Sequence, residues 1–447
     1  MQLWIWGLHS KGKFKMKILL VNFNNHEVYS GMYSLAALAS YIEQPGIEVR
    51  VMDALRQPFY EMLISWKPDI VGITSYTVWY GKVVEHAHRI KALLPTCKLV
   101  IGGHHITSLP ESFVSPPFDY GIIGEGEEAF LKLCRGKCIK GVITQKVPTD
   151  ANNHCTVPFD HCEPVDVSKL PVVDLPKYTD LSNYAQGLVG LVASRGCYYN
   201  CRYCNIRAMS RNIRLYPVES VAKEIQLYYE TLKTRTMIFW DDVFGLDADW
   251  MNALISELDR KSLLGKIQFY IHVRASTVTE ERCQLWKKLG VVVWNMGIDF
   301  GDDTMLKETK GNDCSVEKNK EALLMAHRYG FSTGGSVVFG APGETIQQMN
   351  RTLEFMTWYA DMKDKGMIGP GSSIWFFVAT PLPRTEWWRL AEENGKVRWD
   401  MDCGRLSLHN WKDHFLLDSS VTEDQFRWVH EHAKRLMARI NGVWSEP

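Results

Sequence analysis

Short apolar runs alternate with stretches of helical periodicity along most of the chain from residue 17 onward. The early apolar runs are rich in β-branched residues, as buried strands are. The predicted strands are 17–22, 48–52, 70–74, 99–101 and 120–123, and the predicted helices are 33–43, 59–66, 82–94 and 127–133. Strands that are apolar on both faces and alternate with helices form parallel sheets with covered faces. We predict an α/β fold that begins with a doubly wound, Rossmann-like domain over residues 16–140, after an N-terminal extension over residues 1–15.

A second alternating series begins after a proline-rich interval. Residues 141–187 hold five prolines, Pro148, Pro158, Pro164, Pro171 and Pro176, a density that suits a linker between domains. The later predicted strands are 190–194, 236–240, 267–273, 291–297, 335–339 and 374–378, and the helices are 218–232, 250–264, 280–289, 316–329 and 346–359. Six strand–helix repeats predict a partial (β/α)6 TIM-type barrel. We assign its core to residues 188–360, and the barrel end with a small, mainly helical C-terminal region to residues 361–447.

Length and charge exclude some partners. The chain has 447 residues, enough for two or three domains, with 51 basic and 51 acidic side chains. A net charge of zero argues against a protein that binds nucleic acid by neutralising phosphates. No apolar run is long enough to cross a bilayer, so we expect no membrane partner. Near the start, the apolar residues precede the lysines, which is the wrong order for an export signal, and we expect a cytoplasmic protein.

Three cysteines carry the strongest chemical signal. Cys197, Cys201 and Cys204 follow the first barrel strand, at the strand end where barrels place their chemistry. A tetrahedral zinc site needs four ligands, and no fourth Cys or His lies nearby. Three thiolates can instead hold three irons of a four-iron cubane and leave the fourth iron open to a small molecule. The alternatives are core cysteines or an incomplete zinc knuckle, and for the other eight cysteines we expect ordinary thiols.

The Cys-x3-Cys-x2-Cys spacing, with Tyr203 before the last cysteine, closely resembles the radical S-adenosylmethionine (SAM) enzymes. The resemblance implies that the three cysteines hold a [4Fe–4S] cluster and that SAM chelates its open iron. It also implies reductive cleavage of SAM to a 5′-deoxyadenosyl radical, and a low-potential electron donor such as flavodoxin or ferredoxin.

Further motifs at successive strand ends support this resemblance and imply SAM contacts. The predicted SAM-binding residues are Tyr203, Asp241, Asp242, Arg274, Asp299 and Gly340. Asp241 and Asp242 stand where the family often carries Gly-Gly-Glu and can take the ammonium of SAM, although helix capping or a solvated loop explains either residue alone. Asp299 stands where relatives often have Glu, and Gly340 opens a Gly-Ala-Pro-Gly-Glu turn that lets backbone approach the adenosine. No residue is singled out as a catalytic acid or base.

The turns that end three strands of the first domain resemble the cobalamin-binding domain fused in front of one class of radical SAM enzymes. Ligands of open parallel sheets bind beyond these strand ends. The predicted cobalamin contacts are Ser75, Tyr76, Thr77, Gly102, Gly103, His104, Gly124, Glu125, Gly126 and Glu127. The Asp-x-His-x-x-Gly motif of many cobalamin proteins is absent, and so is the usual proline pair after the first strand. We expect His26, His104 and His105 to be polar surface rather than cobalt ligands. The alternative is a domain kept only as structure.

Together these resemblances imply a cobalamin-dependent radical SAM enzyme, most simply a methyltransferase for an unactivated carbon of a small molecule or peptide. One SAM supplies the radical, methylcobalamin supplies the methyl group, and a second SAM remethylates the cobalt. The alternatives are a cobalamin-assisted oxidation, cyclisation or rearrangement, a radical SAM enzyme without cobalamin such as a methylthiotransferase, and a non-enzymatic sensor. For the tryptophans of the C-terminal region, we expect packing onto the barrel.

Overall fold

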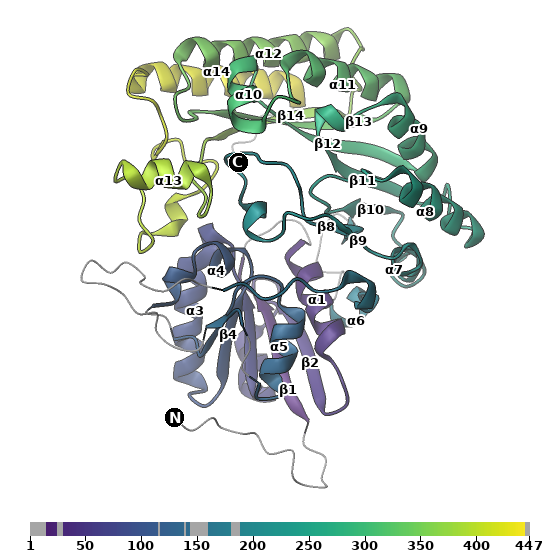
Figure 1. The fold of residues 1–447 in the computed structure, drawn as a ribbon, viewed down its shortest axis with the longest axis vertical. Coiled ribbons are helices and arrows are strands. Elements are labelled where there is room, and N and C mark those ends of the chain that lie inside the picture. The colour runs from purple at the N-terminus through teal and green to yellow at the C-terminus, as the bar shows by residue number, and fades with distance from the viewer. Residues whose placement is uncertain are drawn as a thin grey trace.

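Two parallel sheets organise the chain in the computed structural model, which describes residues 15–24, 30–114, 117–137, 140–143, 160–179 and 188–442 (Figure 1). One sheet lies in the N-terminal domain and the other forms the barrel. The predicted fold class is therefore confirmed: a Rossmann-like domain, a partial barrel and a helical C-terminal region. Among the described residues, no helix has both the length and the apolar character needed to cross a membrane.

The N-terminal sheet has apolar layers on both faces, as its unbroken apolar strands predict. In spatial order its strands are β2 (Ile47–Asp53), β1 (Met16–Asn22), β3 (Ile70–Thr74), β4 (Lys98–Gly102), β5 (Tyr120–Ile122) and β6 (Val142–Ile143). Leu20 packs on the side of α1 (Ser30–Ile42) and α5 (Glu127–Cys134), and its neighbour Leu19 packs on the side of α2 (Phe59–Trp66) and α3 (Tyr80–Leu93). The edge strand β6, antiparallel to β5, was not predicted because two residues carry no periodic signal.

The barrel sheet follows chain order and stays open. Its parallel strands are β7 (Val189–Leu191), β10 (Thr236–Phe239), β11 (Gln268–Val273), β12 (Val291–Asp299), β13 (Ser332–Phe339) and β14 (Ser373–Val378). Among the described residues, β7 and β14 do not pair, so the barrel is partial. The outer helices are α7 (Val218–Thr231), α8 (Ala248–Arg260), α9 (Glu280–Leu289), α10 (Asp303–Lys310), α11 (Val316–Tyr329) and α12 (Ile346–Asp364).

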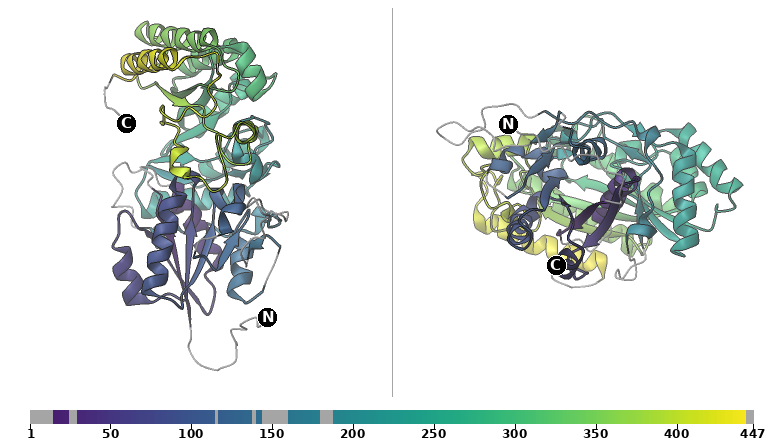
Figure 2. Two further views of the ribbon diagram at one scale, coloured as in Figure 1. Left: turned by 90° about the vertical axis from the view of Figure 1, so that its left-hand side faces the viewer. Right: turned by 90° about the horizontal axis from the view of Figure 1, so that it is seen from below.

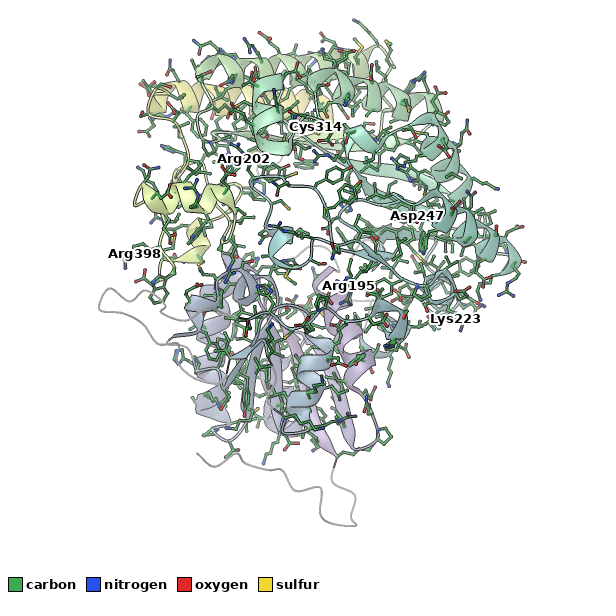
Figure 3. The ribbon with its side chains drawn as sticks, in the orientation of Figure 1. Arg195, Arg202, Lys223, Asp247, Cys314 and Arg398 are labelled. Carbon is green, nitrogen blue, oxygen red and sulfur yellow. The ribbon has the colours of Figure 1, made fainter. Side chains whose placement is uncertain are left out.

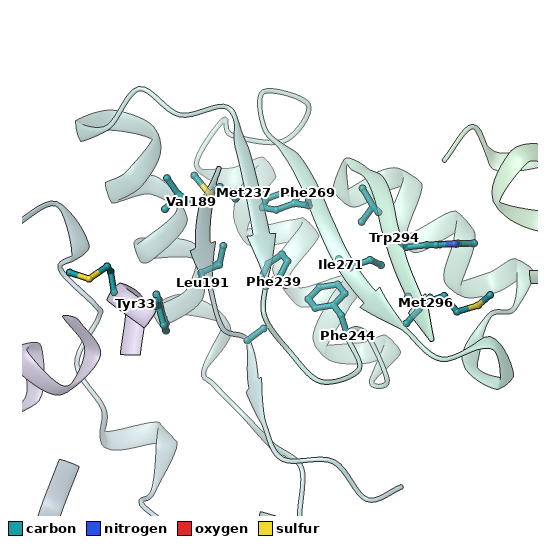
Figure 4. Packing of buried hydrophobic residues seen from close by; sticks show 14 of the residues in the cluster. Tyr33, Val189, Leu191, Met237, Phe239, Phe244, Phe269, Ile271, Trp294 and Met296 are labelled. Carbon is teal, nitrogen blue, oxygen red and sulfur yellow. The ribbon is translucent and has the colours of Figure 1, made fainter. Parts of the chain in front are cut away.

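Side chains of the barrel strands alternate between two environments. Leu191, Phe239, Phe269 and Trp294 from neighbouring strands share the buried core beneath the helices (Figure 4). The alternate positions, such as His272 on β11, are half-buried and face the opposite side of the sheet. The sheet therefore has one apolar face for packing and one face that is free to line a site.

The C-terminal region and the linker connect the two domains. Helix α14 (Glu423–Asn441) packs along α12, α13 (Glu386–Glu393) buries Trp387 and Trp388, and the short turn η7 (Cys403–Arg405) lies against η1 (Thr77–Trp79) of the first domain. The described part of the linker contains η3 (Val167–Lys169) and α6 (Leu175–Tyr178). Perpendicular views show the N-terminal domain against one end of the barrel (Figure 2).

Candidate active site

One cavity of about 340 Å³ joins the carboxyl end of the N-terminal sheet to the barrel. The N-terminal domain contributes the glycine turns after β4 and β5, and the barrel contributes Gly196, Trp240 and Asp242. The cavity also extends along the sheet face beneath α1 and α5, where it is lined by Leu20, Gly72, Val100, Ile122 and Phe130. The interior of the first domain and the loop of the three cysteines therefore border the same space.

Glycine is required where the first domain meets this cavity. Gly103 and Gly124 both have φ of 95°, in the left-handed region. A Cβ atom on Gly103 would lie 2.7 Å from Oγ1 of Thr74. Glycine at Gly103 is thus required by packing on the neighbouring strand end. A Cβ atom on Gly102 or Gly126 would meet nothing within 4 Å, so these two positions leave open space in which a bulky ligand can approach the main chain.

The structure brings most of the predicted cobalamin contacts to the cavity but not all. Those that line it are Gly102, Gly103, His104, Gly124, Glu125, Gly126 and Glu127. Ser75, Tyr76 and Thr77 do not line it: the amide of Ser75 donates to the carbonyl of Gly102 at 3.1 Å, and this residue supports the turn from behind. His26 lies outside the described residues. The expectation that His105 is polar surface is wrong, because its ring is fully buried.

The two glutamates at the rim of the cavity pair with arginines of the barrel domain. Nη2 of Arg195 donates to Oε1 of Glu127 at 2.6 Å, and Arg195 lies between the domains (Figure 3). Arg214 forms a fork with both carboxylate oxygens of Glu125. Burial raises the pKa of Glu125, but the hydrogen bond from Arg214 and the charge of Arg195 outweigh it and hold this pKa below its usual value. Besides lining the cavity, these carboxylates dock the two domains.

The three cysteines lie on one loop between β8 (Ser194–Arg195) and η5 (Asn205–Ala208), and each is half-buried with a free thiol. Within the described ranges, no three His, Cys, Asp or Glu side chains gather around a point that one metal ion could occupy. Thiolates that bind separate irons of a cubane do not share one coordination sphere, whereas zinc ligands must. The three cysteines share one loop, as the predicted ligands of one cluster must.

The structure distinguishes the two neighbouring aspartates after β10. Asp241 is 2 % exposed and accepts hydrogen bonds from the amide of Ala193 at 2.9 Å and from Oγ of Ser194 at 2.5 Å. Burial raises its pKa to about 7. Asp242 is accessible from the cavity and has no hydrogen bond or ion pair with the described residues, while the surrounding protein raises its pKa to about 6. Asp242 is thus the carboxylate available to a ligand, and Asp241 fixes the strand ends.

Arg274 lies behind the cysteine loop and contacts it directly. Its Nη1 donates to Sγ of Cys201 at 3.3 Å, and its Nε and Nη2 each donate to the carboxylate of Asp313 at 2.8 Å. Arg274 is 5 % exposed and its guanidinium also lies 4.1 Å from the ring centre of Tyr199. In the structure, Arg274, a predicted SAM contact, therefore bonds a cysteine and does not line the cavity.

Asp299 and Tyr203 belong to an adjoining buried cluster. The hydroxyl of Tyr203 donates to Oδ2 of Asp299 at 2.9 Å, and Nζ of Lys310 pairs with the same oxygen at 2.6 Å. Asp299 has φ of 63°, which is strained for a residue with a side chain. Its carboxylate is satisfied by these partners, so the structure gives both residues a supporting place beside the cysteines.

The turn that contains Gly340 is held by its own last residue. Oε2 of Glu344 accepts hydrogen bonds from the amides of Gly340 at 2.7 Å and Ala341 at 3.1 Å. A Cβ atom on Gly340, whose φ is 81°, would lie 3.1 Å from the ring of Phe426. Burial raises the pKa of Glu344 to about 8. Gly340 stands at a strand end as predicted, but its amide is already occupied.

Sequence reasoning assigned no role to several residues that build the site. Trp240 lines the cavity and stacks on His272, with ring centres 5.5 Å apart. Arg195 stands two residues before Cys197, and this place beside the cysteine motif was the signal that the sequence offered. The sequence offered no signal for Arg214 or Lys310. The partner of Arg214, Glu125, is distant along the chain, and no local pattern relates Lys310 to its partner Asp299.

Two family profiles match the chain. The profile of the radical SAM superfamily matches residues 191–356, which contain the three cysteines, Asp242 and Arg274. The profile of the B12 binding domain matches residues 27–133, which contain the glycine turns. The chain therefore combines a B12-binding domain with a radical SAM domain. The predicted cofactor set, a [4Fe–4S] cluster, SAM and cobalamin, is confirmed at the level of these domains.

Relatives and a solved structure extend over most of the chain. It is 24 % identical over 396 residues to the "uncharacterized methyltransferase PH0819" of Pyrococcus horikoshii, covering 86 % of this chain and 81 % of the relative. It is 24 % identical over 368 residues to the hopanoid C-3 methylase of Methylococcus capsulatus, covering 79 % and 67 %. The radical SAM methyltransferase TsrM of Kitasatospora setae, solved with tryptophan substrate and a SAM analogue, has a TM-score of 0.70 at 22 % identity and covers 86 % and 77 %. The likeness to TsrM establishes a shared fold.

Proposed function

We propose that this radical SAM enzyme methylates an unactivated carbon of a small molecule or peptide with the help of cobalamin. The observation that carries the proposal is the single cavity bordered by the glycine turns of the B12-binding domain and by Gly196, Trp240 and Asp242 of the barrel. An unactivated carbon has neither an acidic proton nor a lone pair, so methyl transfer to it requires a radical. When bound, SAM on the cluster supplies that radical and methylcobalamin supplies the methyl group.

The residues of the chain then have distinct tasks. Cys197, Cys201 and Cys204 hold the cluster, and Asp242 takes the ammonium group of SAM, because it is the accessible carboxylate beside the cysteine loop. The glycine turns admit the corrin ring, and the apolar channel beneath α1 and α5 takes the nucleotide tail of cobalamin. The arginine–glutamate pairs at the rim restrict water.

Methyl transfer is preferred over other cobalamin-assisted chemistry because the relatives described above include proteins named as methyltransferases or methylases. A small-molecule substrate is consistent with tryptophan as the substrate bound to TsrM. We further propose that a low-potential donor such as flavodoxin or ferredoxin reduces the cluster.

The decisive experiment is anaerobic production with cobalamin, followed by cobalt, iron and sulfide analysis and by turnover with SAM that carries a deuterated methyl group. Candidate metabolite and peptide pools serve as substrates. Methylation predicts a deuterated-methyl product with S-adenosylhomocysteine and 5′-deoxyadenosine in equal amounts. Oxidation, cyclisation or rearrangement predicts 5′-deoxyadenosine without a methylated product.

Matched cysteine variants make this experiment specific. Cys201→Ala removes a proposed cluster ligand, and we expect loss of cluster iron and of both SAM products. Cys283→Ala changes a buried thiol of α9, and we expect full iron content and product formation. Iron without cobalt in the parent protein would overturn the methyltransferase proposal and leave the radical SAM assignment intact.

A further inference from the structure

Three side chains form a row on the face of the barrel sheet that lies opposite the core residues of Figure 4. They are Trp240 directly after β10, His272 on β11 and Asn295 on β12, and the strand register pairs His272 with Asn295. Trp240 also lines the cavity, and His272 stacks on it with ring centres 5.5 Å apart and an interplanar angle of 25°. The row therefore continues the cavity wall across the sheet.

Glycines make room for both ends of this row. A Cβ atom on Gly190 of β7 would lie 2.1 Å from Nε1 of Trp240. A Cβ atom on Gly334 of β13 would lie 2.3 Å from Oδ1 of Asn295. The indole and the amide therefore lie directly against the backbone of the neighbouring strands, which fixes their positions.

The imidazole of His272 presents a hydrogen-bond acceptor. Its Nδ1 donates to the carbonyl oxygen of Phe239 at 3.2 Å, and a carbonyl can only accept, so Nδ1 carries a proton. Burial lowers the pKa of His272, so the ring is neutral at pH 7 and Nε2 keeps a lone pair. Among the described residues, no hydrogen bond reaches Nε2 or the amide of Asn295, and neither group is sealed from solvent. Both groups are therefore open to a ligand.

The same face of the sheet is aromatic and almost without charge. In the six barrel strands, Asp299 is the only Asp, Glu, Lys or Arg residue, and Lys310 pairs with it. Trp375 on β14 is 48 % exposed, and the register places Ser336 beside it, which is too small to cover the indole. A charged group bound here would lose its hydration without gaining a counter-charge, whereas an aromatic ring would gain contact with Trp240 or Trp375.

We propose that this face binds the substrate, and that the substrate carries an uncharged aromatic ring whose N–H or O–H group donates to Nε2 of His272. The ring belongs to a free small molecule or to a peptide side chain. The inference rests on the proposed function and narrows its substrate class. Asn295 contacts the polar edge of the same ring, and Trp240 is a positioning residue, because its stacking holds the imidazole in place.

The test is binding of aromatic probes to the full-length protein, prepared without oxygen and with cobalamin, by saturation-transfer difference nuclear magnetic resonance. Each probe is compared with its methylated form, which keeps the ring and lacks the donor: indole with 1-methylindole, and 2-naphthol with 2-methoxynaphthalene. One hydrogen bond changes affinity by a factor of about three to ten, so we expect one donor-bearing probe to bind that much more tightly than its methylated form. A carboxylate on the ring, as in indole-5-carboxylate, should weaken binding about tenfold.

Two variants identify the acceptor. His272→Phe keeps a ring for stacking and removes the acceptor, so the preference for the donor-bearing probe should disappear. His430→Phe is the matched control and should keep the preference, because His430 also stacks on a tryptophan, Trp411, with ring centres 4.1 Å apart. The comparison of probes on the parent protein needs no variant, so a misfolded variant does not rescue the inference.

Four results overturn the inference. They are binding of neither probe pair by the parent, equal binding of both members of each pair, a preference that persists in His272→Phe, and tighter binding of the carboxylate than of indole. If the same preparation contains iron and cobalt, these results leave the proposed function standing. A preparation with iron but no cobalt overturns the proposed function, and the inference with it.

Blocked Gly-Trp-Gly and Gly-Tyr-Gly tripeptides distinguish the two sources of the ring. Tighter binding of a tripeptide than of indole or 2-naphthol identifies a peptide side chain. The reverse order identifies a free small molecule. Both orders require the aromatic donor that we propose.

Discussion

The hydrogen bond from Arg274 to Cys201 predicts a measurable property of the cluster. Nη1 lies 3.3 Å from Sγ, and the arginine is 5 % exposed, so water cannot replace it as a donor. Hydrogen bonds to cluster sulfurs favour the reduced, more negative state and raise the reduction potential. Arg274→Met removes the donor and keeps a long side chain in the same space, so we expect a lower potential.

The magnitude follows from the partners of Arg274. Asp313 accepts two of its hydrogen bonds at 2.8 Å each, so the pair carries little net charge and the bond to sulfur is the main contribution. A hydrogen bond to a charged group contributes about 1.5–3 kcal/mol, of which only the difference between the two oxidation states counts. If that difference is about 1 kcal/mol, the potential falls by about 40 mV for a one-electron couple.

The assay is a redox titration of reconstituted protein, followed by the paramagnetic signal of the reduced cluster. Parent and variant must hold equal iron and sulfide. Asp313→Asn is the matched control, and its expected shift in reduction potential has the opposite direction. It leaves the charge of Arg274 uncompensated and should therefore raise the potential. A potential in Arg274→Met equal to or above that of the parent would refute the reasoning.

Three further predictions concern titration and docking. In its proposed role, Asp242 binds the ammonium of SAM as a carboxylate, and burial raises its pKa to about 6. SAM affinity should then fall about tenfold per pH unit below about pH 6, and Asp242→Asn should flatten this dependence in calorimetric titrations. Arg214→Met removes the bidentate partner of the mostly buried Glu125 and leaves it the longer ion pair with Arg195 at 3.6 Å. We expect it to destabilise the docked domains by about 2 kcal/mol, measured as a lower unfolding midpoint and faster loss of cobalamin. Burial raises the pKa of Glu344 to about 8 from 4.5, so the folded protein keeps a proton that the unfolded chain releases. Stability should therefore fall as pH rises through that interval, and Glu344→Gln should make this slope shallower in urea unfolding, leaving the part that Asp241 contributes.

The sequence predicted the elements whose signals are local. Helices α2, α9 and α11 begin and end at the predicted residues, since α9 and α11 have side-chain caps at Thr279 and Ser315 and glycines after their last turns. Helix α10 was missed because its eight residues contain only two apolar side chains, Met305 and Leu306. Long, periodic elements with caps are readable from the sequence, and short polar helices are not.

The candidate site likewise contains features that local motifs predict and features that only the fold reveals. The cysteine spacing and the glycine turns are local motifs; the glycine turns border the cavity, and the cysteine loop reaches it through Gly196. Asp241 and Asp242 are equivalent in the sequence, and only the fold shows that Ala193 and Ser194 engage the first of them. Pairs such as Arg214 and Glu125 join segments that no periodicity relates, so the sequence carries no signal for them.

The docking contacts set the distance between the two cofactor sites. Arg195 stands two residues before Cys197, and its partner Glu127 directly follows Gly126 of the cavity. One ion pair of 2.6 Å thus connects the loop of the cluster to the turn that borders the cobalamin space, and its side chains are only 21 % and 9 % exposed. Loss of one partner of such a pair leaves an uncompensated charge, so separation of the domains is opposed. The spacing of the cysteine loop and the cobalamin-binding turns therefore depends on these contacts as well as on the linker, and Trp240 and the glycine turns line the cavity between them.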